Sequence, residues 1–323
     1  MKEKLELDLK FLNDNFKELR KDKSNKFISF SMLTTIDTCL RLYRFSYIDK
    51  PDVERDNVYT YLGTLSHSLI EQLYRDEISK EEAINILKNK VNTMKYYFID
   101  YTFVENVEKR KEMEDKNNLY EKNYTDNLIK YFKNFKKSNY IGFLQEKHIS
   151  LELKKLFNKL PFTEYVFNGI VDFIGINEDG SLDIIDYKTS TVYKGEKLKL
   201  HSFQLILYAL CLEKLGYKIN KISWNFIKYN IAVKTLKNGN TKYYVKERRS
   251  TEEDKYDNVK DYLLDVEYNE ATKRETLRFL YDNIIKIYKL KVFDKLNVNK
   301  LPNSYNPFFC ENLCPYYKLC ELK

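Results

Sequence analysis

The sequence predicts a mixed α/β (α+β) fold, in which a small mixed sheet is flanked by helices and preceded by a large helical part. Helical spacing of apolar residues dominates the chain as far as residue 138. From Ile141 onward the apolar period changes to two, which indicates β-strands. Further along, strand-like segments alternate with helical ones, and this order is typical of helices packed beside a sheet.

The helical part begins with an amphipathic segment over residues 1–25. Ser29 or Ser31 is a suitable N-cap for the next helix, which carries Cys39. Both hydroxyls stand just before an apolar run, where they could accept hydrogen bonds from free backbone N–H groups. We therefore expect a helix to begin near residue 30.

A further helix is expected over residues 61–74, where His67 and Glu71 share one face because they are four residues apart. A lone histidine on a helix is more often structural than a metal ligand, so spacing alone leaves its role open. Residues 80–138 contain neither Pro nor Gly and are expected to be helical throughout.

The second half of the chain is expected to hold the sheet. Its centre is a β-hairpin over residues 167–190, with a turn at residues 177–180, where Asn, Asp and Gly tolerate positive φ. The other expected elements are a strand over 143–153, a helix over 198–215, strands over 221–229 and 241–249, an exposed connection or short helix over 250–270, and a helix over 272–293.

Two acids and one lysine project from the hairpin: Asp172, Asp186 and Lys188. Because side chains alternate along a strand, each should lie on an otherwise apolar face. The expected apolar neighbours are Ile170, Ile174 and Ile176 on the first strand and Leu182 and Ile184 on the second. A carboxylate in such a place requires a partner, which is either a bound cation or a buried Asp–Lys pair.

The composition limits the class of protein. The chain has 323 residues, 43% hydrophobic and 32% charged, and no apolar run long enough to span a bilayer. Its N-terminus lacks the apolar core of a signal peptide, so a cytoplasmic protein of bacterial, archaeal or viral origin without a membrane partner is expected. The net charge of +8 and the abundance of Tyr, Phe and Lys suit a nucleic-acid partner, although A+T-rich coding explains the same composition equally well.

Four cysteines form a second candidate site. Cys310, Cys314 and Cys320 lie in the last fourteen residues, and Cys39 is the obvious fourth ligand for them. Four thiolates suit either a [4Fe–4S] cluster or zinc. Cys211 falls in the apolar stripe of the helix over 198–215 and is expected to be a buried core residue.

The order of these segments resembles the PD-(D/E)XK nuclease superfamily, and more narrowly the RecB/AddB-type exonucleases and the related CRISPR-adaptation nucleases. The segments that carry the resemblance are Gly63-Thr64-Leu65-Ser66-His67, Gly169-Ile170-Val171-Asp172, Asp186-Tyr187-Lys188-Thr189 and Gln204-Leu205-Ile206-Leu207-Tyr208. With the four cysteines the resemblance covers nearly the whole chain. It implies a restriction-endonuclease-like core.

The resemblance also implies the roles of individual residues. It assigns Mg²⁺ or Mn²⁺ ligation to His67, Asp172, Asp186 and the carbonyl oxygen of Tyr187. Lys188 would orient the attacking water and stabilise the charge of the transition state. Gln204 and Tyr208 would brace the site or hold the DNA backbone, and Glu71 and Glu146 are candidates for supporting it from behind the ligands. For Cys39, Cys310, Cys314 and Cys320 the resemblance favours [4Fe–4S] over structural Zn²⁺.

The expected function is a metal-dependent DNA exonuclease that hydrolyses phosphodiester bonds of single-stranded DNA or DNA ends in recombination, repair or processing. Two alternatives remain: a DNA-binding or assembly subunit that does not cut, and a nuclease subunit active only with a helicase or integrase partner. Ser181 stands where a phosphate-binding loop needs its lysine, so an ATP-driven motor is not expected. We expect one nuclease domain over 1–323, with a helical part (29–140), a catalytic core (141–249) and a C-terminal helix and cysteine tail (250–323).

Overall fold

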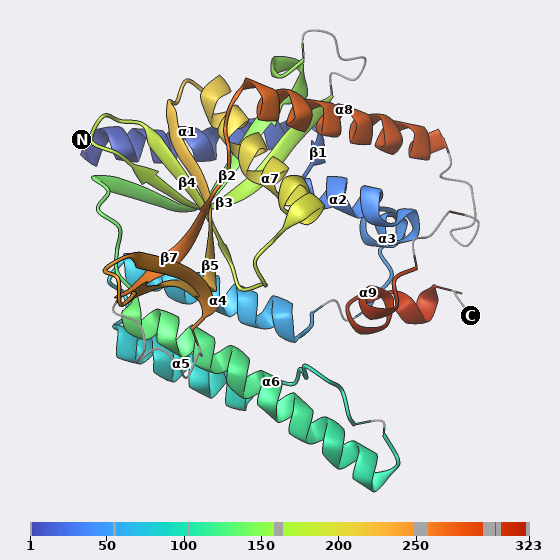
Figure 1. Ribbon diagram of the computed structural model, residues 1–323. Coiled ribbons are helices and arrows are strands. Elements are labelled where there is room, and N and C mark those ends of the chain that lie inside the picture. Colours follow the sequence, from blue (N-terminus) through green and yellow to red (C-terminus); the bar gives the residue numbers. More distant parts are fainter. Residues whose placement is uncertain are drawn as a thin grey trace.

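One mixed sheet runs through the molecule (Figure 1). The structure is a computed structural model that describes residues 2–53, 56–102, 104–157, 164–248, 258–292, 301 and 305–320. The strands in these residues are β1 (Lys26–Ile28), β2 (Gly142–Glu152), β3 (Tyr165–Ile176), β4 (Leu182–Lys188), β5 (Ile219–Thr235), β6 (Thr241–Glu247) and β7 (Asn258–Asp265).

The sheet has the order β1-β3-β4-β5-β6, with β2 also paired to β3 and β7 also paired to β5. The β1–β3 and β4–β5 pairs are parallel, whereas β2–β3 and β3–β4 are antiparallel. The predicted mixed sheet is therefore confirmed, and the predicted hairpin is the β3–β4 pair.

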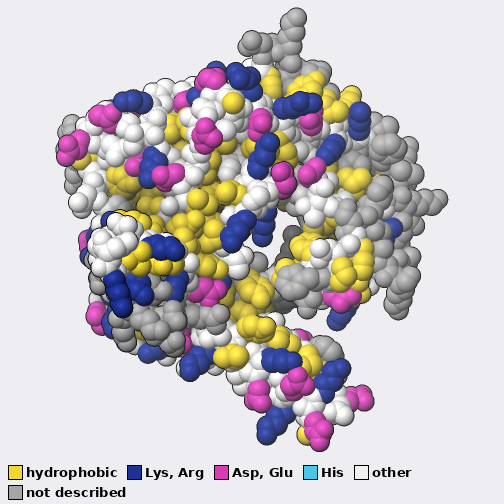
Figure 2. All heavy atoms as spheres, viewed as in Figure 1, with side chains coloured by type: hydrophobic (Ala, Val, Ile, Leu, Met, Phe, Trp, Pro, Cys, Tyr) yellow, Lys and Arg dark blue, Asp and Glu magenta, His cyan; other side chains and the backbone are white. Residues whose placement is uncertain are grey.

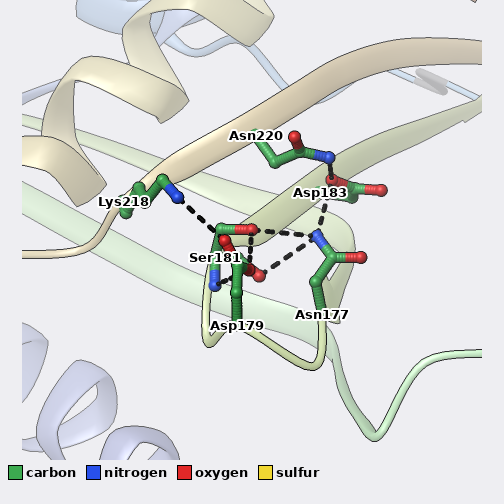
Figure 3. Close-up of polar contacts among 6 residues, drawn as sticks. All are labelled: Asn177, Asp179, Ser181, Asp183, Lys218 and Asn220. Carbon is green, nitrogen blue, oxygen red and sulfur yellow. Dashed lines mark hydrogen bonds and ion pairs between the residues drawn. The ribbon is translucent and has the colours of Figure 1, made fainter.

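A polar network at the β3–β4 turn fixes the register of this hairpin (Figure 3). Asn177 Nδ2 donates to Asp183 Oδ1 at 3.0 Å, and the Asp179 carboxylate accepts from the backbone N–H and hydroxyl of Ser181. Lys218, directly before β5, donates from Nζ to Asp179 Oδ2 at 2.8 Å. Because a slip of one residue would turn every side chain of a strand to the other face, this network helps to place the acids further along both strands.

Helices cover both faces of the sheet (Figure 1). They are α1 (Lys2–Lys21), α2 (Phe30–Thr38), α3 (Leu40–Arg44), η1 (Phe45–Asp49), α4 (Val58–Tyr74), α5 (Lys80–Asn92), α6 (Val107–Asn134), η2 (Leu153–Lys155), α7 (Gly195–Lys214), α8 (Glu270–Val292), α9 (Pro307–Asn312) and η5 (Tyr317–Leu319). Side-chain oxygens cap several of them, and Ser29, one of the two predicted caps, accepts from the backbone N–H of Met32. None of the described helices has the length and apolar character needed to cross a bilayer.

Two hydrophobic cores lie on the two faces. One joins the sheet to α2, α7 and α8 through residues such as Leu33, Leu207 and Ile284. The other joins it to α4, α5 and α6 through residues such as Leu69 and Leu128. Cys211 is fully buried in the first core, as predicted from the stripe of α7.

Two expectations about local structure are wrong, and one short strand was not predicted. Residues 80–138 are not helical throughout, because α5 ends at Asn92 and α6 begins at Val107. Asn117, on α6, accepts the backbone N–H groups of Phe98 and Ile99, so the intervening segment is held by tertiary contacts rather than by helical ones. Residues 258–265 form strand β7 instead of a connection or short helix, and the short strand β1 was not predicted.

Candidate metal and nuclease site

The two aspartates of the hairpin lie at one level of the sheet. The β3–β4 ladder pairs Phe173 with Ile185, and one further step places Asp172 opposite Asp186. At that step the ladder ends, and Asp172 Oδ2 accepts the backbone N–H of Tyr187 at 2.8 Å. The carboxylate of Asp172 is thereby fixed against β4, within electrostatic range of Asp186.

The regular pleat is interrupted at the same level. Val171 and Ile174 belong to one core although they are three residues apart, whereas strict alternation would place them on opposite faces. The prediction that Asp172 shares one apolar face with Ile170, Ile174 and Ile176 is therefore wrong, and Ile170 is 42% exposed. Opposite Asp172 on β2, Glu146 has a φ of +48°, an uncommon value for a residue with a side chain. Such irregularities redirect side chains near functional sites.

Helix α4 brings His67 to these carboxylates. Its Nδ1 atom lies 3.6 Å from Asp172 Oδ2 and 3.8 Å from Glu146 Oε1, and its Nε2 atom lies 3.0 Å from the carbonyl oxygen of Tyr187. Ligand atoms of His67, Glu146 and Asp172 all lie within 4.8 Å of one another, and they form the only such group in the described part of the chain. Glu71, one turn after His67, pairs instead with Arg75.

Charge accumulates in this site. Burial and the neighbouring Asp186 raise the pKa of Asp172 to about 7. Burial by itself lowers the pKa of His67, but Glu146 and Asp172 outweigh it and raise the pKa to about 8. These shifts show that the acids repel one another and that positive charge is favoured among them. A divalent cation would neutralise the charge of these acids in the same way. A set of carboxylate, carbonyl and imidazole ligands suits Mg²⁺ or Mn²⁺.

Lys188 lies beside Asp186 at the end of β4. Its Nζ atom is 2.5 Å from Asp186 Oδ2, an ion pair without regular hydrogen-bond geometry, and it lies 5.1 Å from the centre of the Trp224 ring. Burial lowers the pKa of Lys188, but Asp186 and Asp172 reverse this and raise it overall. Lys188 therefore carries its proton at neutral pH and can supply positive charge but cannot act as a base.

Gln204 and Tyr208, predicted on one helix face, form a hydrogen bond in which Gln204 Nε2 donates to the Tyr208 hydroxyl at 2.9 Å. Tyr208 packs on β3 at Gly169, where an added Cβ would stand 2.4 Å from its ring. The glycine is required for this close approach. Burial raises the pKa of Tyr208, and the charge of Asp186 contributes to this increase.

The four predicted cysteines line one cavity of about 20 Å³ between α3 and α9. Cys39 lies between α2 and α3, and Cys310, Cys314 and Cys320 lie in and after α9. In the described residues no three of their sulfur atoms lie within 4.8 Å of one another, whereas a tetrahedral zinc site would hold them about 3.8 Å apart. The cysteines therefore share one location without the spacing of a single-ion site.

The structure thus brings together most of the predicted site residues and adds others. His67 and Asp172 form one group with Glu146 beside the middle of β3, whereas Asp186 lies outside that group and pairs with Lys188 at the end of β4. Gln204 and Tyr208 lie on α7, where Tyr208 contacts β3 at Gly169. Glu146 lies beside His67 as a member of the candidate ligand group and does not support the ligands from behind, as had been expected. Only the pairing of β2 with β3 could reveal this position. Trp224 was not predicted. The parallel pairing of β4 with β5 places it beside Lys188, and residue spacing within one segment does not show such a pairing.

The chain belongs to the PD-(D/E)XK nuclease superfamily, whose family model matches residues 28–321. The predicted superfamily is confirmed, and membership implies hydrolysis of nucleic-acid phosphodiesters in general. A solved structure described as "Crystal structure of SSO0001" is similar at 16% sequence identity, over 97% of this chain and 96% of that chain, with a TM-score of 0.35. No curated protein matches the chain.

Proposed function

We propose that this protein is a Mg²⁺- or Mn²⁺-dependent DNA exonuclease of the RecB/AddB type, acting on single-stranded DNA or DNA ends in recombination, repair or processing. The observation that carries the proposal is the grouping of His67, Glu146 and Asp172, with the Asp186–Lys188 pair opposite Asp172 where the β3–β4 ladder ends. We propose that the whole chain serves as one nuclease domain. A helicase or recombination partner is compatible with this role.

The residues that would hold the metal are His67, Asp172, Asp186 and the carbonyl of Tyr187, with Glu146 as a further oxygen ligand. When bound, the metal lowers the pKa of water and neutralises charge on the scissile phosphate. The backbone N–H of Tyr187 holds the Asp172 carboxylate in place, at 2.8 Å. A fixed carboxylate needs no reorganisation when a cation binds, which favours affinity.

Lys188 would stabilise the negative charge that develops on the phosphate. Its ammonium is held between the Asp186 carboxylate and the Trp224 ring, so its position is set before substrate arrives. The Lys188 side chain is 23% exposed, and a partly buried cation acts in a medium of lower dielectric constant than water, where its field is stronger. Gln204 and Tyr208 would brace this side of the site or hold the DNA backbone. Lys and Arg side chains also lie beside a hollow between the part with α7 and α8 and the part with α4 and α6 (Figure 2).

For the cysteine cavity we propose a [4Fe–4S] cluster held by Cys39, Cys310, Cys314 and Cys320, with structural Zn²⁺ as the alternative. A cluster is larger than one ion, so its thiolates stand further apart than those of a zinc site. The cavity also contains the buried Arg41, whose NH1 atom lies 3.6 Å from Cys320 Sγ. The positive charge of a guanidinium at this position stabilises the deprotonated thiolate form of cysteine, which is the form that binds a cluster or zinc. Anaerobically purified protein should be brown, with iron near four per chain; colourless protein with stoichiometric zinc would assign the site to zinc.

The nuclease proposal is tested with Asp186→Ala and Lys188→Ala. Each should abolish Mn²⁺-dependent degradation of end-labelled DNA while the protein remains folded by circular dichroism. Lys221→Ala is the matched control, because Lys221 lies on β5 in an exposed pair with Asp265. Cleavage by Asp186→Ala or Lys188→Ala at the wild-type rate would reject this site. A wild-type protein that binds DNA but cuts neither single nor double strands would favour the DNA-binding alternative.

A further inference from the structure

One edge of β3 is open between two strands. β1 pairs with residues 165–167 and β4 with residues 173–176, while β2 occupies the opposite edge along nearly the whole strand. β1 and β4 must therefore share an edge, and neither pairs with residues 168–172. Because β1 is parallel and β4 antiparallel to β3, their carboxyl ends point toward each other across this gap.

A cavity of about 470 Å³ occupies the gap. Its floor is β3 at Asn168, Gly169 and Ile170, and Lys188 lies at the β4 end. The first residues of α2 line the opposite end, because α2 follows β1 directly. One turn of α7 forms a wall with His201 and Gln204. The cavity is therefore continuous with the candidate nuclease site and extends away from the metal ligands.

The chemistry of the lining suits an anionic chain rich in oxygen. No Asp or Glu lines the cavity in the described part of the protein, and Lys188 supplies a positive charge. The other polar groups are hydroxyls, amides, phenols and an imidazole, including those of Ser31, Thr34, Asn168 and His201. Ser, Thr, Asn, Gln and Tyr side chains are the usual uncharged partners of nucleic-acid phosphates and sugars. His201 also stacks on Tyr193, with ring centroids 4.3 Å apart, which offers a flat surface beside these groups.

We propose that this gap binds one nucleotide of a single strand, the nucleotide next to the scissile phosphate, with its sugar–phosphate against the start of α2. This inference rests on the proposed nuclease function and adds a subsite to it. The cavity has the volume of a pocket for one small ligand, which admits a single nucleotide and not a stacked base pair. The protein would therefore distinguish single-stranded from double-stranded DNA at this gap, beside the reacting phosphate.

The decisive variant is Ser31→Glu. Ser31 is exposed at the second position of α2, and the helix is capped by Ser29, so the cap is retained. An acid in the first turn also suits the helix dipole, so the fold should be undisturbed. Thr38→Glu is the control, because it adds the same charge at the exposed last residue of α2, outside the cavity.

Binding of a short fluorescein-labelled oligothymidine is measured by fluorescence anisotropy in EDTA, where cleavage does not occur. Ser31→Glu should raise the Kd about tenfold, Thr38→Glu should leave it within about twofold, and Ser31→Lys should lower it. A blunt duplex should show no more than about a twofold change in any variant. An unchanged Kd for Ser31→Glu, an equal loss in Thr38→Glu, or an equal loss on the duplex would overturn the subsite. Cleavage by the wild type is scored separately, so failure of the nuclease function would be seen independently of this result.

Discussion

The two candidate metal-binding regions are built in different ways. The carboxylate region draws its ligands from adjacent strands of one sheet and from α4, and the hydrogen-bonded ladder sets their spacing. The cysteine cavity joins Cys39, near the start of the chain, to three cysteines near its end. The sheet fixes the first region, whereas the second lies between the short helices α3 and α9. Substitutions in the two regions should therefore affect cleavage and stability differently.

The largest effect is expected in the carboxylate region with His67→Ala. Loss of this proposed metal ligand should lower Mn²⁺-dependent cleavage by about 100-fold or more. The melting temperature should change little, because His67 is 27% exposed and lies on an otherwise well-packed helix. Cleavage rate, iron content and melting temperature are measured on the same preparation. A variant that loses iron together with activity would show that the two regions are not independent.

Cys310→Ser should give the opposite pattern. We expect loss of bound iron and a fall in melting temperature of about 4 °C or more, since a structural cofactor contributes directly to stability. Cleavage per folded molecule should stay near the wild-type value. Cys211→Ser, at a buried cysteine outside the cavity, controls for loss of a core thiol. If Cys310→Ser melts like the wild type, the cysteines do not tie the tail to α3.

Gly169→Ala tests how tightly the carboxylate region is packed. The added methyl group would stand 2.4 Å from Tyr208 Cε1, so the ring must move away from β3. We expect a loss of about 1–3 kcal/mol in the free energy of unfolding, measured in urea, and reduced cleavage. Gly239→Ala, in a turn with open space around the Cα, is a control for adding a methyl group, although its φ of +81° adds strain of its own. Full cleavage activity in Gly169→Ala would mean that cleavage does not depend on the position of Tyr208.

The smallest effect is expected at the far end of the hairpin with Tyr140→Phe. The Tyr140 hydroxyl donates to Asp183 Oδ2 at 3.1 Å, next to the turn network of Figure 3. Removing one such hydrogen bond should lower the free energy of unfolding by about 0.5–1.5 kcal/mol, with cleavage retained. Tyr243→Phe, at a ring that is 64% exposed, is the matched control. A loss of cleavage larger than the loss of stability would show that the turn network sets the active register more strictly than we infer.

Residue spacing was enough to predict the features that depend on local backbone geometry. Period two marked the β3–β4 hairpin and placed Asp186 and Lys188 on one face, and period 3.6 placed Gln204 beside Tyr208. The resemblance to a known superfamily rested on these same short segments. Local patterns of this kind follow from backbone geometry, which a window of a few residues already contains.

Contacts between distant segments supplied the other residues of the site, and local patterns do not predict such contacts. Strand order and register brought Glu146 to His67, placed Trp224 beside Lys188, and left the open edge of β3 between β1 and β4. Strand β7 was missed for the same reason, because its charged sequence forms a strand only where β5 supplies the partner. These features arise from pairing between segments far apart in the chain, and the free energy of such pairing is not encoded in the spacing of neighbouring residues.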